Sequence, residues 1–232
     1  MVPNSLSHWS LSQSSGCLFL IALCLWVAGC STSTNKKTKK GSTGGAAEKL
    51  PVIDADTAIA IDAGRITVAS PVGWTRSPKS KDYLVRYQPG AKKTFPSIVV
   101  TADDALAGFT EITTENQPQF VEAIATDLAA TFSKEGKSSL LKKPTAVSLG
   151  SHLGVSWAAP GTAKVGGLSE NLDRLLYAVV IGGRLYTVEV RAPKGKLDDT
   201  GRAAAKAVAI ALTASGGGAV DGPPDPEAVP DA

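Results

Sequence analysis

Residues that could do acid–base, metal or phosphate chemistry are few and widely spaced in this 232-residue chain. The chain has two histidines, His8 and His152, and a zinc site built on histidine needs more ligands than these. His152 lies within Gly150-Ser-His-Leu-Gly154, a sequence typical of a solvent-exposed turn. No Gly-x-Ser-x-Gly motif supplies a serine nucleophile. We therefore predict no catalytic centre, no metal site and no cofactor.

Three acidic or glycine-rich patterns resemble ligand sites, but each has a simpler interpretation. Asp54-Ala-Asp56-Thr57 has the paired aspartates of phosphotransferases, yet we expect an N-terminal polar loop there. Residues 161–167 have half the spacing of a phosphate-binding loop but lack its Lys-Ser/Thr, so we expect a loop between two hairpins. The pairs Asp103-Asp104 and Asp198-Asp199 lack the alternating oxygens of an EF-hand, and a turn and a helix start account for them.

The three cysteines, Cys17, Cys24 and Cys30, all lie near the N-terminus. An uncharged apolar run of 12 residues extends from Cys17 to Ala28. A helix that spans a bilayer needs about 20 such residues, so this run fits the hydrophobic region of a signal peptide better than a membrane span. The alternative is a buried strand or helix that happens to end at Cys30.

The end of this run, Val27-Ala-Gly-Cys30, resembles the lipobox of bacterial lipoproteins in all four positions. The resemblance implies that residues 1–29 are removed as a signal peptide and that the Cys30 thiol carries a diacylglyceryl group. It further implies a chain that is exported, anchored to a bacterial membrane and facing the periplasm, with the outer membrane as a destination in cells that have one. Once residues 1–29 are removed, no thiol remains for a disulfide, a zinc site or a nucleophile.

Composition predicts one folded domain, residues 51–214, between two disordered segments. The linker, residues 30–50, has no large apolar residue between Cys30 and Leu50. Its lysines could attract anionic head groups, at about 1 kcal/mol each, or could simply be solvated; they are Lys36, Lys37, Lys39 and Lys40. The tail, residues 215–232, is rich in Gly and Pro and carries only acidic charges. A net charge of +3 gives no case for nucleic-acid binding.

Local patterns within the domain alternate between strand and helix. Expected strands lie at residues 58–61, 65–69, 83–87, 97–101, 146–149, 155–158, 175–181 and 184–190. Phe120, Ile124, Leu128 and Phe132 form one apolar stripe of a helix, and a second helix is expected at residues 197–213. Gly182-Gly183 favours a type I′ turn. We predict an α+β fold with a mostly antiparallel sheet of about six to eight strands, covered by two main helices.

Two segments of the domain resemble the PsbP-like fold, which some small bacterial lipoproteins share. They are Ile66-Thr-Val-Ala-Ser-Pro-Val-Gly-Trp74 and the closing hairpin Gly183-Arg-Leu-Tyr-Thr-Val-Glu-Val190 before a terminal helix. The resemblance covers residues 58–213 and implies a PsbP-like sandwich with an accessory or assembly role beside larger complexes, mostly without catalysis. No ligand or metal residue of that family can be matched by motif.

Residue types favoured at interaction hot spots suggest a partner surface. The candidates are Trp74, Arg76, Tyr83, Arg86 and Trp157, with Tyr87 beside them. The alternative is that Trp74 plugs one end of the sheet and Trp157 packs under a helix. Alternation places Leu84 and Arg86 on one face of their strand, opposite Tyr83, Val85 and Tyr87.

Three functions remain open for such a domain. The first is a non-catalytic domain that binds or stabilises an envelope protein partner. The second is a binder of a small ligand or lipid, with its pocket between helix and sheet. The third is an enzyme whose carboxylates or lysines come together only in the tertiary structure.

Overall fold

The computed structural model describes residues 49–215, except residues 78–79, 91–92, 136–139 and 166. The predicted signal peptide, Cys30, almost the whole linker and the acidic tail beyond residue 215 lie outside these described residues. In the described part, ten strands form two antiparallel sheets and two helices pack on them. The predicted α+β class with two main helices is thus confirmed.

The strands divide between a larger and a smaller sheet. The larger sheet contains β3 (Thr75–Arg76), β4 (Val85–Gln88), β5 (Ser97–Asp104), β6 (Lys142–Leu149), β7 (His152–Val165), β8 (Leu168–Ile181) and β9 (Arg184–Pro193). Their order is β3-β4-β5-β9-β8-β7-β6. The smaller sheet contains β1 (Ile53–Ile61), β2 (Ile66–Pro71) and β10 (Thr213–Ala214), in the order β1-β2-β10. The sequence pattern did not predict that β1 and β2 would separate from the main sheet.

Strands β6 to β9 form a meander of three hairpins. Gly182 and Gly183 have φ angles of +57° and +74°, as the predicted type I′ turn requires. The loop predicted at residues 161–167 is wrong, because Gly161–Val165 continue β7 and pair with Leu168–Leu172 of β8. Their small and polar side chains show little alternation, but backbone pairing needs no apolar face.

The predicted polar loop around Asp54 and Asp56 is also wrong, because both residues lie in β1. Asp54 pairs with Ser70 of β2, and the Thr57 hydroxyl accepts a hydrogen bond from the Ser70 backbone N–H at 2.9 Å. The register shifts between Asp54 and Ile59. The strand is therefore polar and irregular at its start and apolar towards its end.

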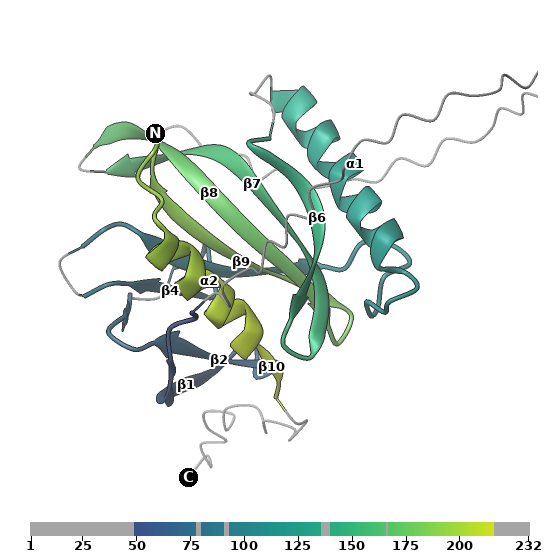
Figure 1. Cartoon of the computed structure of the whole chain (residues 1–232), viewed down its shortest axis with the longest axis horizontal. Coiled ribbons are helices and arrows are strands. Elements are labelled where there is room, and N and C mark those ends of the chain that lie inside the picture. The colour runs from purple at the N-terminus through teal and green to yellow at the C-terminus, as the bar shows by residue number, and fades with distance from the viewer. Residues whose placement is uncertain (1–48, 78–79, 91–92, 136–139, 166, 216–232) are drawn as a thin grey trace, which may run out of the picture. The chain divides into compact units, whose positions relative to one another are not determined.

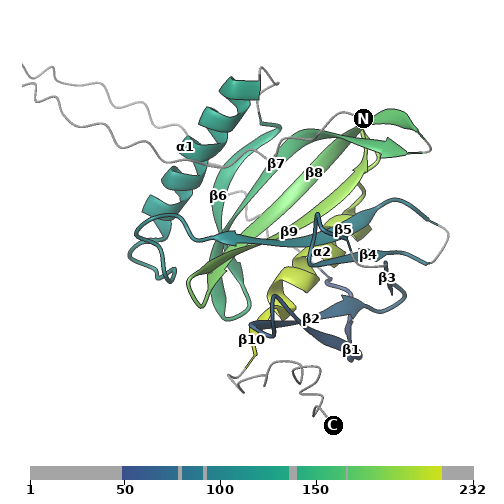
Figure 2. The ribbon, with the colours of Figure 1, turned by 180° about the vertical axis from the view of Figure 1, so that it is seen from behind.

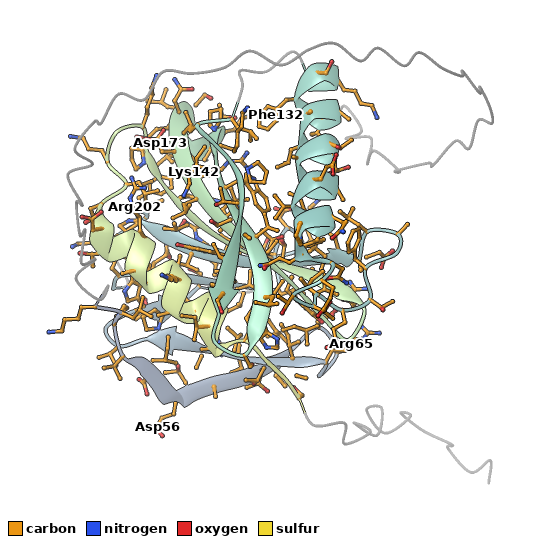
Figure 3. All side chains as sticks on the ribbon, turned by 45° about the vertical axis from the view of Figure 1, so that its right-hand side comes forward. Asp56, Arg65, Phe132, Lys142, Asp173 and Arg202 are labelled. Carbon is orange, nitrogen blue, oxygen red and sulfur yellow. The ribbon has the colours of Figure 1, made fainter. Side chains whose placement is uncertain are left out.

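The two helices cover different faces of the larger sheet, as Figures 1 and 2 show from opposite sides. Helix α2 (Asp199–Ala211) and the smaller sheet enclose one core, which includes Tyr87 and Tyr186. Helix α1 (Gln117–Glu135) packs against β6 and β7 and encloses the other. Figure 3 shows Phe132 on α1 and Arg202 on α2. The predicted stripe on α1 faces the second core, since Phe120 and Ile124 are buried there and Leu128 and Phe132 pack beside them.

Candidate binding groove

The structure gathers three of the five predicted surface residues and separates the other two. Trp74, Arg76 and Tyr83 line adjoining cavities between β1 and the β3–β4 region. Trp157 is 5% exposed and packs in the core beneath α1, so it contributes to no surface here. The packed alternative is the correct one for Trp157. Arg86 points to the opposite face of the sheet, and the predicted alternation along β4 is confirmed because Val85 and Tyr87 are buried while Arg86 is half-buried.

The first cavity has a volume of about 620 Å³ and a mostly apolar lining. It is lined by Ile59, Ala60, Ile61, Arg76, Ser77, Tyr83, Leu84 and Val85. The second has a volume of about 420 Å³ and is lined by Asp56, Thr57, Ala58, Ile59, Ser70, Trp74, Thr75, Arg76 and Tyr87. Because Ile59 and Arg76 line both, the two cavities adjoin. We call them together the β1–β4 groove. It lies between two sheets, whereas the sequence placed a pocket between helix and sheet.

Both walls of this groove are strand edges. Three consecutive residues, 59–61, line the larger cavity from one side, and residues 83–85 line it from the other. Successive side chains of a strand point to opposite faces, so consecutive lining residues mean that the cavity runs along the edge of the strand. In the described part of the chain, β1 is the outermost strand of the smaller sheet, and the two-residue β3 covers only the far end of β4.

One wall is fastened to the larger sheet at the turn after β1. The Tyr186 hydroxyl donates a hydrogen bond of 2.7 Å to Oδ2 of Asp62, and Arg184 Nε lies 3.0 Å from the same oxygen. Asp62 itself has a φ of +52°, a left-handed conformation that aspartate tolerates better than most residues. This contact joins β1 to β9 by a buried, charge-assisted hydrogen bond.

The polar end of the groove holds a buried hydroxyl without a partner. Tyr87 is 1% exposed, and its hydroxyl has no hydrogen-bond partner among the described residues. Burial raises the pKa of Tyr87 to about 12, against the opposing effect of the Arg76 guanidinium. Arg76 pairs with Tyr87 in the β3–β4 register, is exposed, and forms no ion pair with a described residue. Sequence reasoning placed Tyr87 beside the candidate surface but could not show that its hydroxyl is unpaired.

Arg86 belongs to a different environment, on the face of the larger sheet that α2 does not cover. Its Nη2 donates to the Thr94 carbonyl at 3.2 Å, and its row across the sheet continues through Val99 to Glu189. Glu189 is buried and paired with Arg191 at 2.8 Å. The five candidates therefore do not form one partner surface.

The described residues show little chemistry outside the groove. No group of three or more His, Cys, Asp or Glu residues among them could hold a metal ion. His152 is half-buried at the start of β7, with Nε2 3.1 Å from the Leu212 carbonyl oxygen, so the prediction of an exposed turn histidine is wrong. The turn is shorter than predicted, because β7 already begins at His152. None of the helices in residues 49–215 is long and apolar enough to cross a bilayer.

Comparison with known proteins gives only distant structural similarity. A protein from Bacteroides thetaiotaomicron VPI-5482 aligns with 11% identity and a TM-score of 0.43, over 68% of this chain and 48% of that one, so this chain spans about half its length. CyanoP, the cyanobacterial PsbP of Synechocystis sp. PCC 6803, aligns with 14% identity and a TM-score of 0.42, over 75% of this chain and 98% of that one.

LpqN of Mycobacterium tuberculosis, described as involved in cell envelope biogenesis, aligns with 12% identity and a TM-score of 0.38, over 65% of this chain and 83% of that one. No protein-family model and no curated protein matches the sequence. At these TM-scores we base no argument on the three structures, and the PsbP-like resemblance stays a prediction.

Proposed function

We propose that this chain is an exported, non-catalytic lipoprotein, attached to the bilayer through an acylated Cys30, whose folded domain binds and stabilises an envelope protein partner in the β1–β4 groove. The observation that carries the proposal is the composition of the groove. Trp74, Arg76 and Tyr83 meet there beside an apolar cavity, and Trp, Tyr and Arg are the side chains that dominate protein–protein binding energy.

The sequence at the N-terminus supports the location. Val27-Ala-Gly-Cys30 matches the lipobox, and the polar residues 31–49 would let the domain reach roughly 25 Å from the anchor. The test of the anchor is Cys30→Ala. We expect the wild-type chain to partition with membranes and to gain the mass of a diacylglyceryl group, and the variant to lose both properties. Unchanged fractionation without a mass difference would exclude lipid attachment at Cys30.

The test of the groove is site-directed photo-crosslinking in the native cell. A benzophenone amino acid replaces Thr75, which lines the groove, or Leu168, which is 77% exposed on the β7–β8 hairpin. We expect a discrete crosslinked protein band from position 75 and none from position 168. The same band from both positions, or none from either, would show that the groove is not the partner site.

A matched pair of variants separates groove binding from general surface effects. Ala60 is exposed and lines the larger cavity, so Ala60→Lys places a long charged side chain in the groove. Ala55 is exposed on the same strand but lines neither cavity, so Ala55→Lys is the control. Ala60→Lys should abolish the position-75 crosslink and Ala55→Lys should leave it intact.

A second candidate function is the binding of a small apolar ligand or lipid, and the cavity volume favours it. About 620 Å³ lies within the range of small-molecule pockets, roughly 300–1,000 Å³. Solvent extraction of the protein purified from its own cells, followed by mass spectrometry, distinguishes the two functions. A stoichiometric small molecule that Ala60→Lys removes and Ala55→Lys retains would replace the protein partner as the occupant.

A further inference from the structure

The two ends of the β1–β4 groove differ in the chemistry that they can bind. The larger cavity takes its lining mainly from aliphatic and aromatic side chains, among them Ile59, Ile61 and Leu84. The smaller cavity contains the buried Tyr87 hydroxyl and the Arg76 guanidinium. An occupant of the whole groove therefore needs an apolar part and, beside it, a group that accepts hydrogen bonds.

The polar end favours an anionic acceptor. The Arg76 guanidinium only donates hydrogen bonds and carries a fixed positive charge, and it has no ion-pair partner among the described residues. A buried hydroxyl without a partner loses its hydration and gains nothing in return. A carboxylate could accept from both groups at once, and charge-assisted hydrogen bonds of this kind are about twice as strong as neutral ones.

Two features of the cavity must allow this contact. Arg76 stands opposite Tyr87 in the register and bonds to no described residue, so its exposed side chain can turn aside and uncover the hydroxyl at little cost. Asp56 is the one acidic residue lining this cavity, and its charge would oppose an anion. Figure 3 shows Asp56 pointing outward from β1, and no ion pair joins it to Arg76.

The shape of the groove favours a peptide over a simple amphiphile. Residues 56–61 of β1 line it along a length of about 17 Å, which suits an extended segment of five or six residues. Within the described chain β1 pairs with β2 on one side only, so the backbone groups on its other edge are available for an added strand. Binding by strand addition takes affinity from main-chain hydrogen bonds and specificity from side-chain pockets.

We infer that the β1–β4 groove recognises an extended segment of the partner protein that carries apolar side chains followed by an aspartate or glutamate. The apolar side chains occupy the cavity beside Ile59, Ile61 and Leu84, the backbone of the segment pairs with the free edge of β1, and the carboxylate bonds to Arg76 and the Tyr87 hydroxyl. This inference rests on the proposed function, because it names the chemistry of the partner at the same groove.

The experiment is a selection of random eight-residue peptides on the purified full chain in detergent, followed by affinity measurement. Wild type should enrich peptides in which apolar residues precede an acidic one at fixed spacing. Arg76→Met and Tyr87→Phe should each weaken the best peptide by about tenfold. Arg202→Met, which removes an equal charge on α2, should leave its affinity unchanged. Replacing the acidic residue of the peptide by its amide should cost the same factor on wild type and nothing on Arg76→Met.

The outcomes separate this inference from the proposed function. Enriched peptides that Ala60→Lys abolishes, but that carry no acidic preference, would overturn the inference and leave groove binding intact. Enriched peptides insensitive to Ala60→Lys, or none at all, would overturn both. Decanoate serves as a second probe. If decanoate binds in an Arg76-dependent way while no peptide does, the acidic ligand is a small amphiphile and the peptide assignment is wrong.

Discussion

Tyr87→Phe should stabilise the free protein, against the usual direction of a core substitution. Tyr87 is 1% exposed and its hydroxyl has no partner among the described residues, so folding strips the hydroxyl of water without compensation. Such a group costs about 1–3 kcal/mol, and Phe fills the same space without it. We expect the free energy of unfolding to rise by about 1 kcal/mol.

Tyr186→Phe is the matched control because it makes the same change at an equally buried tyrosine with a bonded hydroxyl. Tyr186 is 0% exposed and donates to Asp62 Oδ2 at 2.7 Å. A hydrogen bond to a charged group contributes about 1.5–3 kcal/mol, so we expect a loss of about 2 kcal/mol. The same deletion of one oxygen atom should therefore change stability in opposite directions at the two sites.

Urea unfolding at pH 7, followed by circular dichroism, measures both changes by linear extrapolation. In a domain of this size a change of about 1 kcal/mol also moves the melting temperature by roughly 2–4 °C. A loss of 1 kcal/mol or more in Tyr87→Phe would mean that the hydroxyl is bonded in the folded protein. The assignment of this hydroxyl to a partner's carboxylate would then be refuted as well.

Three further predictions concern the fold. Tyr87 and Tyr186 both have pKa values raised to about 12, with burial as the largest cause, so their contribution is complete below pH 10 and is lost as the pH rises from 10 to 12; urea midpoints across this range should fall less steeply in the two Phe variants. Asp198→Ala should cost about 1 kcal/mol in urea unfolding, because Asp198 Oδ1 caps α2 by accepting from the Gly201 N–H at 2.8 Å; the same loss from Asp199→Ala would contradict this role. Gly154→Ala should lower the free energy of unfolding by more than about 2 kcal/mol, because its Cβ would lie 2.3 Å from a backbone oxygen of β8; wild-type stability would show that the strands can separate there.

Local signals predicted the elements whose cause is local. The helix stripe beginning at Phe120 and the Gly182-Gly183 turn were predicted from spacing and residue type alone, since their geometry depends on neighbours in sequence. The continuation of β7 beyond Gly161 was missed because its side chains are small and polar, and the ladder with β8 that makes it a strand is a tertiary property.

The groove could not be predicted, because it is made by segments that no sequence pattern brings together. Residues 56–61, 74–77 and 83–87 are close in sequence but belong to two different sheets, and the separation of β1 from the larger sheet creates the space between them. Trp74 and Trp157 illustrate the limit. They are the same residue type on strand-forming segments, yet α1 covers Trp157, whereas Trp74 lines the groove.

The two buried tyrosines on the α2 side of the larger sheet show how the groove divides structural and recognition roles. Tyr186 spends its hydroxyl on Asp62, which fastens the end of β1 to β9 and so fixes one wall. Tyr87 lies on the opposite wall and keeps its hydroxyl unpaired beside an unpaired Arg76. A hydroxyl that costs stability in the free protein persists in a fold only when some other benefit offsets it. If the partner's carboxylate is that benefit, Tyr87→Phe must raise stability and weaken binding together. A variant that gained stability without weakening binding would remove Tyr87 from the recognition site and leave Arg76 as its sole polar contact.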